Sequence, residues 1–102
     1  MSDIGARRAT LVRRLLDGEG QASASERGAA FRNSGLTGPA AALVDKVALH
    51  AWQVTDEDIA AVKASGLRED QIFEMVVCAA VGQAARQYDA AVAALEAATG
   101  KE

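Results

Sequence analysis

The C-terminal third of the chain reads REDQIFEMVVCAAVGQAARQYDAAVAALEAAT from Arg68 to Thr99. It contains no proline and is rich in alanine, the strongest helix former, so it predicts one long helix. At 100° per residue its apolar residues form a broad face along the helix. The segment from Met75 to Gly82 is apolar on every side, and a helix of that kind is expected to be buried on every side.

A chain of 102 residues has few other elements with which to cover such a segment. The small residues within it allow another helix to approach closely. The economical prediction is a homo-oligomer with this helix at the subunit interface. The predicted interface residues are Met75, Val77, Cys78, Val81 and Gly82.

Four shorter helices are expected upstream of the long one. The second begins at a serine cap with a glutamate three positions later, the third has a proline in its first turn, and the fourth has a threonine cap followed by three acidic residues. The third of these helices has an expected buried stripe that includes Leu43, Val44, Val47 and Trp52. The four helices are a first over residues 3–17, a second after Ser23, a third from Thr37 and a fourth from Thr55 to Gly66.

The composition agrees with a single helical domain over residues 1–102. Half of the residues are hydrophobic, 25% are charged and only 4% are aromatic. This usage is typical of a globular chain and argues against disorder, while the abundance of alanine favours an all-α fold. The longest apolar stretch is much shorter than the roughly 20 residues that a membrane span needs, so no membrane partner is expected. The N-terminus lacks the apolar core of a signal peptide, which predicts a cytoplasmic protein.

Charge is spread unevenly along the chain. Residues 1–50 hold seven basic and five acidic side chains, whereas residues 51–102 hold four basic and nine acidic ones. Two arginine pairs, Arg7 with Arg8 and Arg13 with Arg14, lie on the first helix. No aromatic residues are interleaved with them and the pI is near 5.1, so nucleic acid is not an expected partner. The acidic second half is expected to receive this basic helix, within one chain or between subunits.

Cys78 is the only cysteine, and it lies four residues after Glu74. Two interpretations follow from this spacing. In one, Cys78 is a redox or nucleophilic thiol with Glu74 as its proton partner. In the other, Cys78 is a small buried apolar residue, as free cysteines usually are. The second is favoured because a nearby carboxylate raises the pKa of a thiol and because Cys78 is far from the positive end of its helix.

His50 is the only histidine and lies near the end of the third helix, two residues before Trp52. It is a candidate general base or metal ligand, although a partly buried histidine at a helix end is the favoured interpretation. A Cys78–His50 pair in space would reverse that preference. With one histidine and one cysteine, no metal site and no cofactor are predicted.

A ligand pocket is expected between the third helix and the long helix. The apolar and aromatic residues Trp52, Phe73 and Tyr88 are its predicted lining. Such a pocket would take a small apolar ligand.

Residues 43–59, LVDKVALHAWQVTDEDI, and 61–80, AVKASGLREDQIFEMVVCAA, resemble the later part of the carboxymuconolactone decarboxylase and AhpD-like superfamily. In that pattern a helix ends in Val-Thr-Asp, a short helix runs to Ala-x-Gly, and a long helix opens with Asp-x-Ile. The resemblance implies a core over residues 37–102, a variable helical part over residues 1–36, and an AhpD-like oligomeric bundle such as a trimer or hexamer.

The peroxidase branch of that superfamily uses a CxxC pair, which this chain lacks. The resemblance therefore implies the fold and the assembly without a redox site. The leading hypothesis is an oligomeric binding or accessory protein for a small apolar ligand or a partner protein. The alternative is an enzyme, either a hydroperoxide-reducing one that uses Cys78 with Glu74 or His50, or a lactone decarboxylase. A third possibility is a small subunit whose missing half comes from a second protein.

Overall fold

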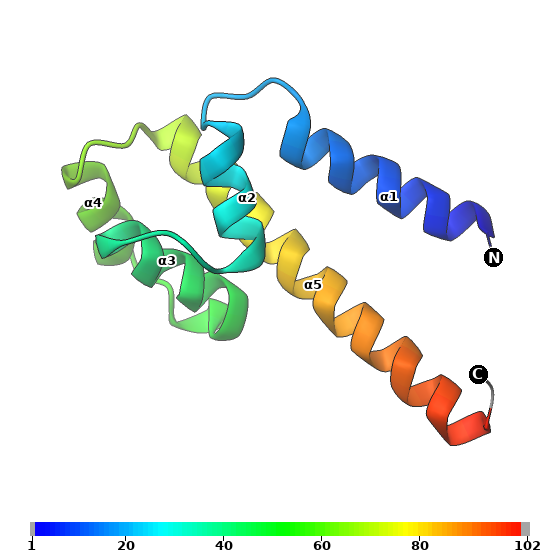
Figure 1. Cartoon of the computed structure of the whole chain (residues 1–102). Helices are drawn as coiled ribbons and strands as arrows, with labels where there is room; N and C mark the ends of the chain where they lie inside the picture. Colours follow the sequence, from blue (N-terminus) through cyan, green and yellow to red (C-terminus); the bar gives the residue numbers. More distant parts are fainter. Residues whose placement is uncertain (1, 101–102) are drawn as a thin grey trace.

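The computed structural model describes residues 2–100, which fold into five α-helices and one 3-10 helix, with no strand in that range (Figure 1). The all-α prediction and the long C-terminal helix are confirmed. The helices are α1 (Ser2–Asp17), α2 (Ala24–Arg32), α3 (Gly38–Leu49), η1 (Ala51–Gln53), α4 (Asp56–Ala64) and α5 (Glu69–Thr99).

The start signals read from the sequence produce the expected caps. The Ser23 hydroxyl accepts a hydrogen bond from the backbone N–H of Glu26, and the Glu26 carboxylate accepts one from the N–H of Ser23. Thr55 and Asp58 form the same reciprocal pair at the start of α4. These reciprocal pairs, called capping boxes, satisfy backbone N–H groups that the first turn of a helix leaves without a partner. Each of the two helices therefore begins directly after its capping residue.

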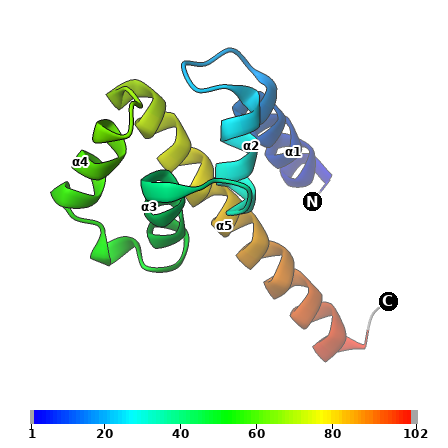
Figure 2. The same ribbon diagram turned by 60° about the vertical axis from the view of Figure 1, so that its left-hand side comes forward.

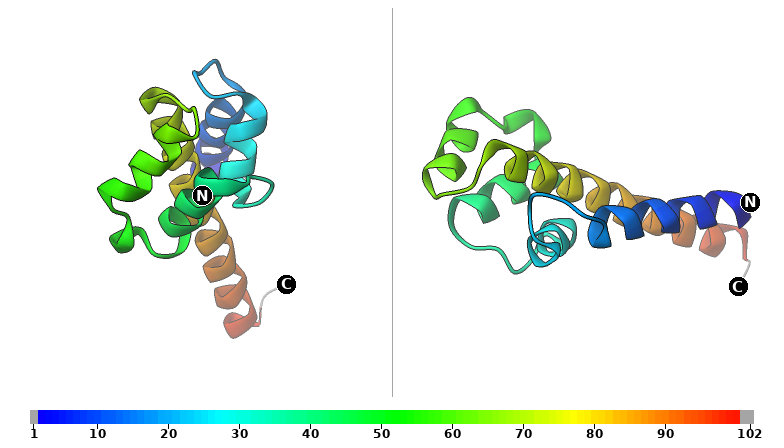
Figure 3. Two further views of the ribbon diagram at one scale, coloured as in Figure 1. Left: turned by 90° about the vertical axis from the view of Figure 1, so that its left-hand side faces the viewer. Right: turned by 90° about the horizontal axis from the view of Figure 1, so that it is seen from above.

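Helices α2, α3 and α4 gather around the N-terminal half of α5, while its C-terminal half extends away from them (Figures 1, 2 and 3). Helix α1 runs in the opposite direction to α5, so the two ends of the chain lie on the same side of the molecule. One buried cluster lies between α2, α3 and α5 and consists of Ala22, Ala30, Val44, Met75, Cys78 and Ala79. A second, of Leu43, Val62 and Ile72, joins α3, α4 and α5.

Helix α2 approaches α5 closely because α5 carries a glycine at the crossing point. A Cβ placed on Gly82 would lie 2.0 Å from the carbonyl oxygen of Phe31 at the end of α2. The same oxygen accepts a hydrogen bond of 2.6 Å from Nη1 of Arg86, one turn further along α5. Gly82 therefore sets the distance between the two helices, and Arg86 satisfies the carbonyl at their contact.

The burial of residues 75–82 on every side was expected from a subunit interface and stays a prediction, since within one chain the segment is buried on one side only. Met75, Cys78 and Gly82 are buried against helices of the same chain, so they lie inside the subunit. Ala80 is exposed, and the other side of the segment is only partly covered, with Val77 and Val81 half-buried. One face of α5 thus belongs to the core of the chain, and the opposite face is covered only in part, by α1.

Trp52 does not belong to the buried stripe of α3. The helix ends at Leu49, and His50 adopts φ −146° and ψ 53°, which breaks the helical period before Trp52 is reached. The indole lies on η1 with 76% of its surface exposed. The prediction failed because it extended the period of α3 beyond the residue at which the helix stops.

Candidate functional site

The thiol of Cys78 lies in the core and has no exposed surface. Burial raises its pKa, and the nearby carboxylate of Glu74 adds to that increase, while Arg27 opposes it. A thiol whose pKa lies above its ordinary value is protonated at neutral pH, and a protonated thiol is a poor nucleophile. The side chain behaves as a small apolar core residue.

Glu74 holds the turn between α1 and α2. Its two carboxylate oxygens accept hydrogen bonds of 2.8 Å and 2.9 Å from the backbone N–H groups of Gln21 and Ala22. These bonds hold the pKa of the carboxyl below its ordinary value of 4.5. Gly20 makes the approach possible, because a Cβ at that position would lie 2.6 Å from a Glu74 oxygen. The carboxylate is engaged by backbone donors and is a weak base, so it is poorly suited to accept a proton from Cys78.

His50 lies on the exposed surface at the end of α3, and its ring meets the Trp52 ring edge to face at 5.4 Å between centroids. Within residues 2–100 no hydrogen bond joins this imidazole to Cys78. The structure therefore places the three candidate catalytic residues in three different roles. Cys78 packs in the core, Glu74 binds a turn, and His50 stacks on an exposed tryptophan.

Two cavities line up along the face of α5 that points away from the core. One, of about 250 Å³, is lined by the apolar residues Leu15, Phe73 and Val77 and by the charged residues Arg14, Glu19, Arg27 and Glu74. The next, of about 300 Å³, lies between α1 and α5 and is bordered by Arg8. We name this surface the apolar trough and define it by Leu11, Leu15, Phe73, Val77, Val81, Ala84 and Tyr88.

The trough contains two of the three residues that the sequence assigned to a ligand pocket. Phe73 lines the first cavity and Tyr88 the second, while Trp52 lines neither. The pocket also has α1 as its second wall, where the sequence had placed the third helix. Helical period alone shows which residues share one face of α5, but it does not show which other helix that face meets.

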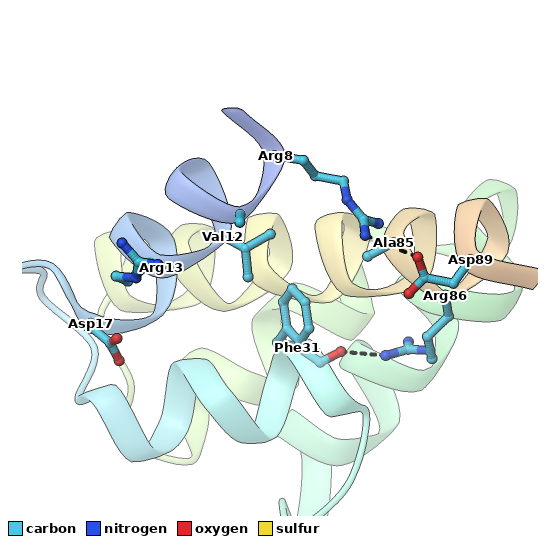
Figure 4. Close-up of a pocket in the computed structure, with 9 residues that line it drawn as sticks. Arg8, Val12, Arg13, Asp17, Phe31, Ala85, Arg86 and Asp89 are labelled. Carbon is cyan, nitrogen blue, oxygen red and sulfur yellow. Dashed lines mark hydrogen bonds and ion pairs between the residues drawn. The ribbon is translucent and has the colours of Figure 1, made fainter. Parts of the chain in front are cut away.

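The basic helix α1 is received by α5 within the same chain. Arg8 forms an ion pair of 3.0 Å with Asp89, and its guanidinium lies 4.9 Å from the centre of the Tyr88 ring. Between α1, α2 and α5 a second cleft of about 400 Å³ is lined by Arg13, Phe31 and Arg86, among others (Figure 4). Cavities on both sides of α1 mean that the helix rests on α5 without filling the space around it.

Arg27 on α2 is a structural residue that the sequence did not reveal. It is only 7% exposed, and its Nη1 donates a hydrogen bond of 2.9 Å to the carbonyl oxygen of Leu15 in the last turn of α1. A cation at the C-terminal end of a helix satisfies a free carbonyl and opposes the negative end of the dipole. The short, weakly apolar α2 gave no sequence signal for a buried arginine.

Within the part of the chain that the structure describes, no cluster of three or more histidine, cysteine or acidic side chains has the geometry of a metal site. Over the same residues no helix is both long enough and apolar enough to cross a membrane. Comparisons with protein-family models, with curated proteins and with solved structures find no significant match to this chain.

The burial of Cys78 leads to a direct prediction about its reactivity. In the folded protein, alkylation by iodoacetamide at pH 8 is expected to be at least about a hundredfold slower than after unfolding in urea, because the thiol is both inaccessible and protonated. Mass spectrometry of quenched samples measures the two rates. Equal rates in the two states would show that the thiol is open to solvent and would restore it as a candidate nucleophile.

Proposed function

We propose that this protein is a non-enzymatic, oligomeric helical binding protein that takes an apolar ligand or partner in the apolar trough. The observation that carries the proposal is the trough itself, a run of apolar side chains between α1 and α5 that the chain leaves largely uncovered. Leu11, Phe73 and Tyr88 are 60%, 67% and 51% exposed. Contiguous exposed apolar surface of this kind typically marks an interaction site.

The shape of the trough suggests what it binds. Its two cavities are small and their walls are mostly apolar, so they suit the side chains of a helix or a compact hydrocarbon group. Charged groups also line the cavities, with Arg14, Glu19, Arg27 and Glu74 at one and Arg8 at the other. Such an arrangement favours an apolar body with charged groups along its flanks.

The enzymatic alternatives draw little support from the geometry. A thiol peroxidase needs an accessible thiolate with a base near it, and Cys78 is buried, protonated and not bonded to His50. Glu74 accepts two backbone hydrogen bonds and is not free to accept a substrate proton. We therefore place the function in the trough and not at Cys78.

The proposed relationship to the carboxymuconolactone decarboxylase and AhpD-like superfamily rests on the order of elements. Helix α3, the turn through Val54 and Thr55, the short α4 and the long α5 follow one another as the sequence resemblance implies. We propose that residues 37–102 have this core without the redox pair. An oligomer is part of the same proposal.

An environment-sensitive apolar dye, anilinonaphthalene sulfonate, tests the trough directly. At low protein concentration the folded protein is expected to raise the dye's fluorescence several-fold, because the exposed apolar walls accept it. Val81→Lys, which puts a charge on the wall, should remove most of the increase. The matched control is Ala60→Lys on the exposed face of α4, which should bind the dye as the unaltered protein does. Dye binding that is unchanged by Val81→Lys would contradict the proposal.

A hydroperoxide assay tests the enzymatic alternative. With hydrogen peroxide or an organic hydroperoxide and dithiothreitol, the unaltered protein and Cys78→Ser are expected to show the same background rate, because the thiol is neither exposed nor ionised. Circular dichroism confirms that the variant is folded. A rate that falls to background only in Cys78→Ser would establish a thiol-dependent activity and refute the non-enzymatic proposal.

A further inference from the structure

We propose that the partner seated in the apolar trough is a second copy of this chain, placed so that the two α5 helices run antiparallel about a twofold axis near Arg86. This inference rests on the proposed function, because it names the occupant of the same trough. In this arrangement the exposed C-terminal half of α5 in each copy lies in the trough of the other.

The chain presents two adjoining apolar surfaces that fit one another. One is the trough, which ends at Tyr88, and the other continues from it along the C-terminal half of α5, where Val92 and Leu95 are 36% and 64% exposed. At 100° per residue, both surfaces lie within about 60° of the same line along α5, on the side opposite the buried core residues. The stripe from Phe73 to Leu95 is about 33 Å long at 1.5 Å per residue. A twofold axis near Arg86, close to the middle of this stripe, brings the trough of each copy against the C-terminal half of α5 in the other copy.

The exposed area of the chain matches what one such interface would cover. Folded monomers of 10.6 kDa expose about 5,500 Å², whereas this chain exposes 6734 Å². The excess of about 1,200 Å² is about one and a half times the roughly 800 Å² that each partner buries in a standard interface. The radius of gyration points the same way, being 15.4 Å where a compact chain of this length has about 13 Å.

Charge favours the antiparallel direction and a second copy as the occupant. The trough is bordered by Arg14, and Arg7 lies two turns earlier on the same side of α1. The other surface is acidic, since residues 87–100 contain Asp89 and Glu96 and no basic side chain. With the axis near Arg86, Glu96 of the partner subunit lies opposite Val76 and hence near Arg14. A parallel pair would instead place the acidic segments of the two copies against each other, where like charges repel.

The first experiment measures mass by light scattering over a range of protein concentrations. The unaltered chain is expected to reach twice the 10.6 kDa of one copy. Leu95→Lys places a charge at the end of the stripe and should raise the dissociation constant at least about tenfold. Ala97→Lys, two residues away and on the opposite face of the exposed helix, should leave it unchanged. A mass of 10.6 kDa at every concentration, or dissociation by Ala97→Lys but not by Leu95→Lys, would overturn the proposal.

The second experiment tests the direction of the helices by oxidative cross-linking in a Cys78→Ser background. An antiparallel pair about Arg86 brings Val77 of one copy opposite Leu95 of the other. Each of the variants Val77→Cys and Leu95→Cys should therefore cross-link weakly with itself. A mixture of the two variants should cross-link strongly. Strong cross-linking of either variant with itself would contradict the antiparallel arrangement.

The dye separates this inference from the proposed function. As the dimer forms, dye fluorescence should fall, and Leu95→Lys should restore it, because the second copy covers the residues that bind the dye. A monomeric protein whose trough still binds the dye would overturn the dimer, and with it the oligomeric part of the proposed function, but would leave the trough standing as a binding site. A monomeric protein that does not bind the dye would overturn both.

Discussion

Gly82→Ala is expected to destabilise the protein by about 2–4 kcal/mol, although alanine is the better helix former. The new Cβ would lie 2.0 Å from the carbonyl oxygen of Phe31 and 2.7 Å from its carbonyl carbon. Because these are backbone atoms, the clash is relieved only if α2 moves away from α5. That movement would also lengthen the hydrogen bond from Arg86 to the same oxygen. The roughly 1 kcal/mol that alanine gains in helix propensity does not offset these losses.

Thermal or urea unfolding followed by circular dichroism measures this effect, and the melting temperature should fall by more than about 10 °C. Gly5→Ala is the matched control, since Gly5 is also inside a helix but nothing lies within 4 Å of its Cβ position. There the same substitution should be neutral or stabilising by up to about 1 kcal/mol. If the two substitutions changed the free energy of unfolding by the same amount and in the same direction, α2 and α5 would not be in close contact at Gly82.

Glu74→Ala should be the second most damaging of these changes, with an expected loss of about 2–3 kcal/mol. It removes both acceptors for the N–H groups of Gln21 and Ala22 and so releases the turn that holds α1 against the rest of the chain. Glu69→Gln is the control, because its ion pair with Lys63 is largely exposed and contributes little. Protease cleavage between α1 and α2 should become faster in Glu74→Ala alone. An unchanged cleavage rate would contradict the role assigned to the carboxylate.

The same carboxylate makes stability depend on pH. Backbone hydrogen bonds hold the pKa of Glu74 below 4.5 in the folded state, and the hydrogen bonds from Lys46 and Thr55 hold that of Asp58 below 3.8. Groups whose folded pKa is lowered stabilise the protein fully above their unfolded pKa and cease to do so as the pH falls through the folded value. Stability should therefore be constant above about pH 5.5 and fall below it, and Glu74→Ala should flatten the upper part of that fall.

The helices could be predicted from the sequence because their signals are local. Ser23, Thr55 and Pro39 act on backbone groups within one turn of themselves, so the caps they predict do not depend on the rest of the fold. The helical spacing of the apolar residues along α5 is likewise a local signal that does not depend on the rest of the fold. Trp52 shows the limit of this reasoning, since a change in one backbone conformation at His50 was enough to move it from a stripe to the surface.

The candidate site was only partly predictable, since its walls come from distant parts of the chain. The sequence placed Phe73 and Tyr88 correctly on one face of the last helix, but it had no information on which helix would lie beside them. Arg27 and Leu15, which join α2 to α1, are ordinary residues in the sequence and acquire their role only when the helices meet.

What the sequence determined by itself is the set of helices and the surplus of apolar surface on α5, because both follow from propensity and period along one segment. Which part of this apolar surface is buried depends on the tertiary structure. It buries Met75, Cys78 and Gly82 under α2 and α3, and it leaves Phe73, Tyr88 and Leu95 exposed on the opposite side. The physical reason is that a helix has two faces of similar hydrophobicity here, and the close approach permitted at Gly82 selects the face that meets the core.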